Sequence, residues 1–118
     1  MRAEVKRWWS DGLRDAPEDP EHCCVGMQAD IGPVGAGGGD TFNFEVCTPN
    51  ALASRLDADG RPFWARGTLV VRSFSWETVE AALNQYVRSV DGNDWTEVAT
   101  KLNRFMRWEF EDYEGQQR

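Results

Sequence analysis

Two segments in which apolar and polar residues alternate, here called apolar runs, constrain the fold of this chain more than any other feature. The first run covers residues 23–31, and the second covers residues 42–47. Successive side chains of a strand point to opposite faces of a sheet, so each run predicts a strand with one buried face. Gly32-Pro33 ends the first run, and a glycine-rich connection over residues 35–40 leads to the second. We therefore expect an antiparallel hairpin with a long glycine-rich turn.

Two further strands and a short helix are predicted around this hairpin. Residues 2–9 alternate in polarity and predict a first strand, and the β-branched residues within 67–72 predict a fourth. Thr48-Pro49 predicts a helix start, because the hydroxyl can cap free amides and proline at the first helical position loses no hydrogen bond. We expect this helix to end near Leu56, where the turn-forming residues 57–62 follow.

Two longer helices are predicted in the last third of the chain. Ser75 can cap a helix whose apolar residues recur every three or four positions as far as Val90. Asp94 and Glu97 form a start similar to a capping box for the last helix, whose apolar face extends to Met106. We expect an α+β fold, a mostly antiparallel four-stranded sheet with the two longer helices and the short helix packed on it.

Length and charge restrict the class of protein further. The 118 residues suit one domain, over 1–118, and the net charge of −7 argues against nucleic acid or an anionic membrane as the partner. A charged partner is instead expected to be a basic protein. No apolar run approaches the roughly 18 residues that span a membrane, and the N-terminus lacks the apolar core of a signal peptide. We therefore expect a cytoplasmic protein.

The sequence offers little for catalysis, metal binding or cofactor binding. Its one histidine, His22, could share a face with Cys24, and Cys47 lies on the partner strand. Zinc sites usually show spaced cysteine pairs, whereas the first two cysteines of this chain are adjacent. The glycine-rich segment lacks the lysine and the following helix of a phosphate-binding loop. We expect neither an enzyme nor a metal or cofactor site.

Acidic residues are the remaining candidates for contact with a partner. They occur in the first loop, after the short helix and in the closing segment. The candidates are Asp15, Glu18, Asp19, Glu21, Asp57, Asp59, Glu109, Glu111 and Asp112. Such a surface suits a protein that covers a basic active site, because opposite charges accelerate association.

The closing segment interleaves aromatic rings with carboxylates. Trp108 and Phe110 lie two residues apart, so in an extended segment they share a face and can pack back onto the sheet. Because large rings favour burial, we expect this structural role, with a contact to a partner as the alternative. Replacement of Trp108 by alanine is then expected to unfold the protein.

The order of several short motifs resembles one known family. The motifs are Gly32-Pro33, Phe44-Glu45-Val46-Cys47-Thr48-Pro49, Asp94-Trp95 and Trp108-Glu109-Phe110. In this order and spacing they resemble the bacterial polymorphic-toxin immunity proteins of family eight. The resemblance implies a cytoplasmic α+β immunity protein that binds a cognate toxin domain and blocks it. If the toxin is a nuclease, its cleft should be basic. A small non-enzymatic adaptor or homodimeric assembly domain is the alternative function.

Overall fold

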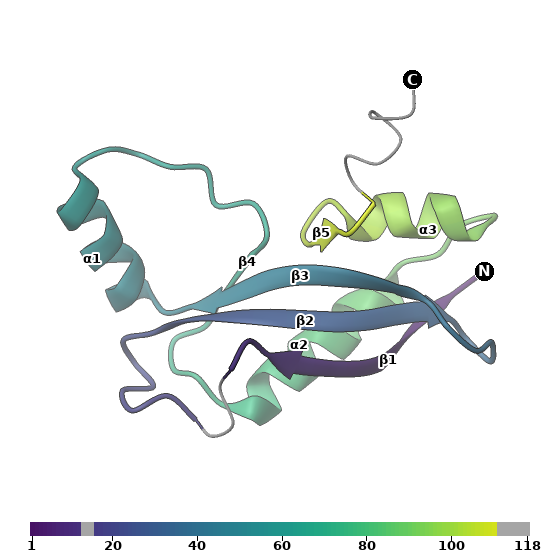
Figure 1. The fold of residues 1–118 in the computed structure, drawn as a ribbon, viewed down its shortest axis with the longest axis horizontal. Coiled ribbons are helices and arrows are strands. Elements are labelled where there is room, and N and C mark those ends of the chain that lie inside the picture. The colour runs from purple at the N-terminus through teal and green to yellow at the C-terminus, as the bar shows by residue number, and fades with distance from the viewer. Residues whose placement is uncertain (13–15, 111–118) are drawn as a thin grey trace.

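A computed structural model describes residues 1–12 and 16–110 of the chain (Figure 1). Within these ranges, eight elements follow one another along the chain. They are β1 (Ala3–Ser10), β2 (Cys24–Pro33), β3 (Asp40–Cys47), α1 (Pro49–Asp59), β4 (Thr68–Val70), α2 (Trp76–Ser89), α3 (Trp95–Leu102) and β5 (Arg107–Trp108). The described strands form one sheet in the order β1-β2-β3-β4, with β5 also paired to β3. Only the β3–β4 pair is parallel, which confirms the predicted α+β class with a mostly antiparallel sheet.

The β2–β3 hairpin has the predicted alternation of buried and outward side chains. Cys24 lies opposite Cys47 at one end of the ladder, and Ile31 lies opposite Asp40 at the other. The strands continue further toward the turn than predicted, because β2 includes Gly32 and Pro33. A Cβ atom on Gly32 would lie 2.1 Å from the carbonyl oxygen of Gly38, so the two backbones approach too closely for any side chain there. The glycine-rich connection is thus a steric requirement of the hairpin.

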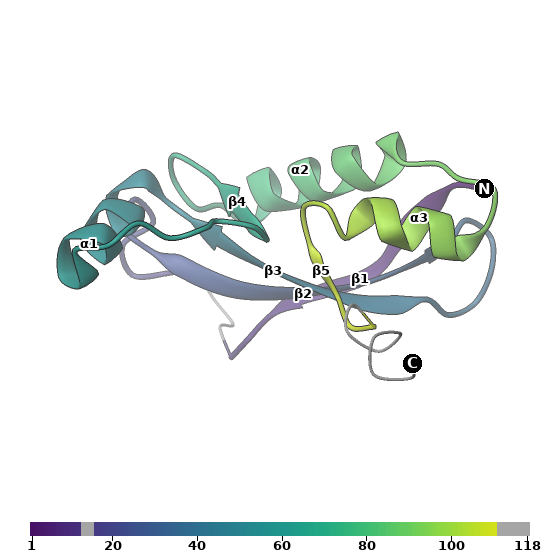
Figure 2. The same cartoon turned by 90° about the horizontal axis from the view of Figure 1, so that it is seen from above.

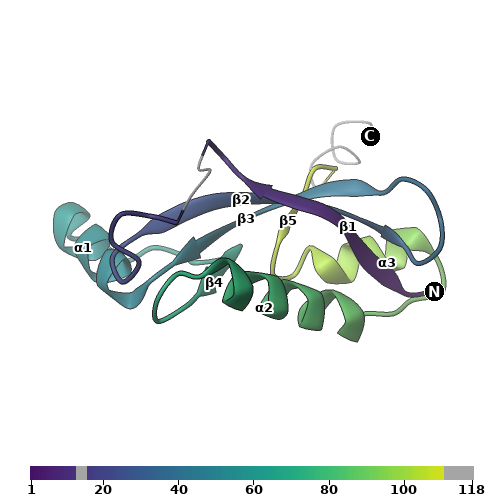
Figure 3. The same cartoon turned by 90° about the horizontal axis from the view of Figure 1, so that it is seen from below.

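Helices α2 and α3 cover one face of the sheet, as Figures 2 and 3 show from opposite sides. No described helix lies over the other face. The covered face and the two helices provide the largest fully buried side chains of the core. These include Met27, Ile31, Phe42 and Val46 from the sheet, Val79 and Val87 from α2, and Val98 and Leu102 from α3. The core therefore lies between the sheet and these two helices.

Two short strands share one edge of β3. β4 pairs in parallel with one end of β3, where Glu45 lies opposite Thr68. β5 pairs in antiparallel orientation with the other end, where Phe42 lies opposite Trp108. β4 is shorter than the predicted strand over 67–72. A strand of only two residues, such as β5, has no detectable periodicity.

Helix α1 differs from the prediction in both length and position. It runs to Asp59, so Asp57 lies within the helix instead of in a following turn. Gly60, with a φ of 72°, provides the left-handed residue that ends it. α1 was expected to pack on the sheet, but it lies beyond the end of β3 and none of its residues, all of which the structure describes, is buried (Figure 1). Helix α3 ends at Leu102, one turn before the predicted end, although Met106 is still buried.

Trp108 packs back onto the sheet, in agreement with the structural role expected for it. Its ring stacks on Phe42 with 6.4 Å between the ring centroids, and the Phe110 ring lies nearly perpendicular to it with 5.9 Å between the centroids. The indole N–H groups of Trp95 and Trp108 both donate to one carboxylate oxygen of Asp40, at 2.7 and 3.0 Å. Asp40 therefore joins the start of β3 to α3 and to β5.

Candidate partner-binding surface

The first group of predicted acidic residues lies beside α1. Glu18, Asp19 and Glu21 are exposed in the connection between β1 and β2. The side-chain amide of Asn50, in the first turn of α1, donates to the backbone oxygen of Glu21 at 3.1 Å. This contact holds the acidic connection against the start of the helix.

The second group lies on α1 itself. Asp57 and Asp59 are exposed in its last turn, and Asp59 forms an ion pair with Arg61 at 3.4 Å. The connection and the helix occupy the same end of the molecule (Figure 1). We call the five carboxylates of these two groups the acidic end. They are Glu18, Asp19, Glu21, Asp57 and Asp59.

The structure does not bring all nine predicted acidic residues together. The Glu109 carboxylate accepts a hydrogen bond from the backbone N–H of Thr41 at 3.0 Å, near the opposite end of β3. Its backbone N–H in turn donates to the Thr41 carbonyl. Glu109 therefore fixes the end of β5 and lies apart from the acidic end. Asp15, Glu111 and Asp112 lie outside the described residues.

Arg55 connects α1 to the sheet. Its guanidinium donates to the Glu45 carboxylate at 3.1 Å and to the Cys24 sulfur at 3.2 Å. Thr68 donates a further hydrogen bond to Glu45 at 3.1 Å. The hydrogen bond from Arg55 lowers the pKa of Glu45, in spite of partial burial, and Thr68 adds to this effect. The ion pair thereby ties α1 to β3, and Thr68 connects the same carboxylate to β4.

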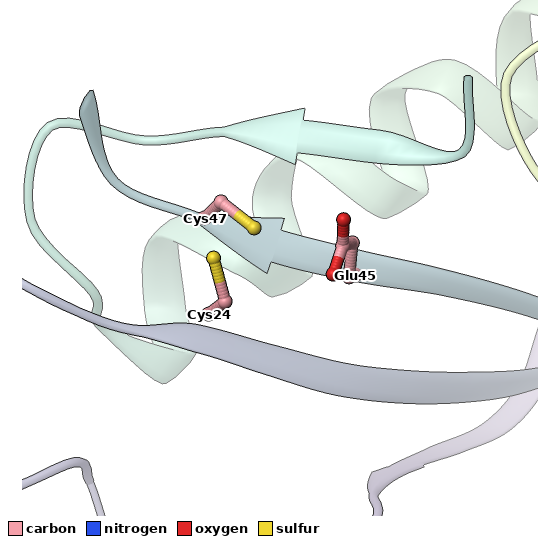
Figure 4. Close-up of side chains that lie close together, drawn as sticks. All are labelled: Cys24, Glu45 and Cys47. Carbon is pink, nitrogen blue, oxygen red and sulfur yellow. The ribbon is translucent and has the colours of Figure 1, made fainter. Parts of the chain in front are cut away.

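Cys24, Glu45 and Cys47 form a cluster whose ligand atoms all lie within 4.8 Å of one another (Figure 4). From the sequence, Cys24 and Cys47 were considered as metal ligands together with His22, and no metal site was expected. The His22 ring instead lies 3.3 Å from the Ser54 hydroxyl on α1. Burial, with a further contribution from Cys24, raises the pKa of the Cys47 thiol and so disfavours its thiolate form. The Arg55 cation beside the cluster also opposes a bound metal ion.

Three exposed apolar residues lie before or after the acidic residues of α1 and were not singled out from the sequence. Trp64 has 97% of its surface exposed, Leu56 has 43% and Phe63 has 37%. The Phe63 ring lies under the Arg55 guanidinium, 5.3 Å from its central carbon. The signal available in the sequence was a pair of large rings directly after the turn residues Gly60-Arg61-Pro62, where apolar side chains are unusual.

The comparisons with known proteins give one match. A family model described as immunity protein 8 matches residues 5–113, which is most of the chain. No curated protein and no solved structure matches the chain. Within the described ranges 1–12 and 16–110, no helix has both the length and the apolar character that crossing a bilayer requires.

Proposed function

The chain belongs to the immunity protein 8 family, and we propose that it binds and neutralises a cognate bacterial toxin domain in the cytoplasm. The match to the family model over residues 5–113 is the observation that carries this proposal. It spans every strand and helix that the structure describes except the first two residues of β1. The family match therefore concerns the whole described fold and not a single motif within it.

We propose further that the acidic end faces the toxin. Its five carboxylates are all exposed, although Asp59 also forms an ion pair with Arg61. The net charge of −7 favours a basic partner surface, such as the cleft of a nuclease. Opposite charges on the two proteins accelerate capture, which matters for an inhibitor that must bind before the toxin acts. Glu109 lies outside this proposed surface, because its carboxylate is engaged by the backbone of Thr41.

Co-expression tests the proposed function. We expect the gene for the cognate toxin domain to lie immediately upstream of this chain's gene, and this toxin domain is induced in a bacterial host with and without the chain. We expect the toxin domain alone to arrest growth and the chain to restore it. A catalytically inactive toxin domain serves as the control for the burden of expression. Continued arrest in cells that contain the folded chain at levels above those of the toxin domain would contradict the proposal.

A further inference from the structure

Helix α1 and the loop after it form an arm that leaves the body of the molecule. We call residues 49–67 the α1 arm. All of α1 is described, and none of its 11 residues is buried. Isolated helices of this length are marginal in water, because most helical stability comes from packing of an apolar face. Within the protein, the Thr48 cap and the Arg55–Glu45 ion pair hold α1 in place, without a buried apolar face of its own.

Trp64 is the most exposed large apolar side chain of the described residues, at 97%. Burial of an indole removes a large apolar area from water, so leaving it exposed forgoes a substantial stabilisation. Tryptophan and arginine are also the residue types most enriched where the binding energy of protein interfaces is concentrated. A hollow of about 330 Å³ opens beside Trp64. Its lining includes Asp11, Asn43, Glu45, Arg66 and Arg107.

We propose that the α1 arm is the surface that binds the toxin domain, with Trp64 as its anchor in an apolar pocket of the toxin that has a basic rim. The inference rests on the proposed function and adds to it the contact surface and the central residue. Leu56 and Phe63 add further exposed apolar surface on the same arm. Asp57, in the last turn of α1, faces the basic rim.

The charges around the arm favour a basic partner. Arg55 pairs with Glu45 and Arg61 pairs with Asp59, so each of these ion pairs is neutral overall. Arg66 donates to the uncharged side chain of Asn103 and keeps its positive charge. Glu18, Asp19, Glu21 and Asp57 outnumber this cation, so the net charge of the acidic end and the arm together is negative. Two copies of this chain that met through their arms would bring two acidic ends together, and like charges across an interface oppose binding.

Binding of the purified toxin domain to Trp64→Ala tests this inference. We expect the dissociation constant to rise about thirtyfold or more, the range of a central interface residue. The thermal midpoint of the free protein should not change, because the removed side chain contacts so little. The matched control is Phe105→Ala, since Phe105 is another ring with 66% exposure that lies outside the arm, between α3 and β5. This control should bind the toxin domain as the unsubstituted chain does.

Hydrogen exchange of the unsubstituted chain gives a second readout that does not depend on the variant. Residues 49–67 should become protected when the toxin domain binds. If the unsubstituted chain binds but Trp64→Ala binds equally well and the arm gains no protection, the inference is wrong and the proposed function stands. If the unsubstituted chain does not bind the toxin domain, both are wrong. If the arm is instead protected by self-association that Trp64→Ala abolishes, the protein that binds to the arm is a second copy of this chain, and the inference is overturned.

Discussion

At the scale of single residues, one carboxylate organises the closing segment. Asp40 accepts hydrogen bonds from Trp95 and Trp108, although the three residues are far apart in the sequence. The sequence predicted that Trp108 packs back onto the sheet, because a large ring two residues from another favours a shared, covered face. It gave no indication of Asp40, since a contact between residues 40 and 108 depends on how the hairpin and α3 are placed by the whole fold.

Truncation of Trp108 is expected to lower the stability of the fold, whereas truncation of Trp64 is expected to leave it almost unchanged. Trp108 stacks on Phe42 and bonds to Asp40, so Trp108→Ala should lower the free energy of unfolding by about 3 kcal/mol. Trp64→Ala should change it by less than about 0.5 kcal/mol, because Trp64 is almost fully exposed. Urea unfolding of both variants measures this difference. An unfolding free energy of Trp108→Ala equal to that of the unsubstituted chain would show that its contacts do not stabilise the fold.

At the scale of elements, periodicity predicted those with a buried face and failed for those without one. β2, β3 and α2 have regular apolar spacing, and the structure contains them close to the expected bounds. α1 has no buried face, so its sequence could indicate its capped start but not its position beyond the sheet. The parallel pairing of β4 with β3 also depends on where α1 leads the chain, which no local pattern specifies.

The Glu45–Arg55 ion pair joins α1 to the sheet, and its effect on stability should depend on pH. Arg55 lowers the pKa of Glu45 in the folded state below the usual value of about 4.3. The unfolded state therefore binds the proton more readily, so the stabilisation is complete at neutral pH and is lost as the pH falls through the lowered pKa. The residues are partly exposed, so the contribution should be about 0.5–1 kcal/mol.

Urea unfolding of Glu45→Gln measures this contribution. The variant should be less stable than the unsubstituted chain at about pH 7, and the difference should shrink at about pH 3. Glu80→Gln, which changes an exposed glutamate on α2, is the control and should have little effect at either pH. A difference for Glu45→Gln that does not depend on pH would exclude the ionised carboxylate as its cause.

At the scale of the whole molecule, the parts of the fold that form the core are separate from the part that carries exposed acidic residues. α2 and α3 cover one face of the sheet and enclose the core, whereas α1 extends from the end of the sheet (Figures 1 and 2). The carboxylates of α1, Asp57 and Asp59, are exposed. The sequence predicted exposed acidic residues but not their arrangement. Residues 18–21 and 57–59 share one end because the first turn of α1 lies beside the end of the β1–β2 connection, while Glu109 is placed elsewhere by β5.

The most direct test of the proposed function is the mass of the species formed when the purified chain is mixed with the toxin domain that we expect to be encoded beside it. Size-exclusion chromatography with light scattering gives this mass for each protein alone and for the mixture. We expect a stable complex that contains both proteins and persists through the column. Separate elution of the two folded proteins at micromolar concentrations would contradict the central claim that this chain is an immunity protein for that toxin domain.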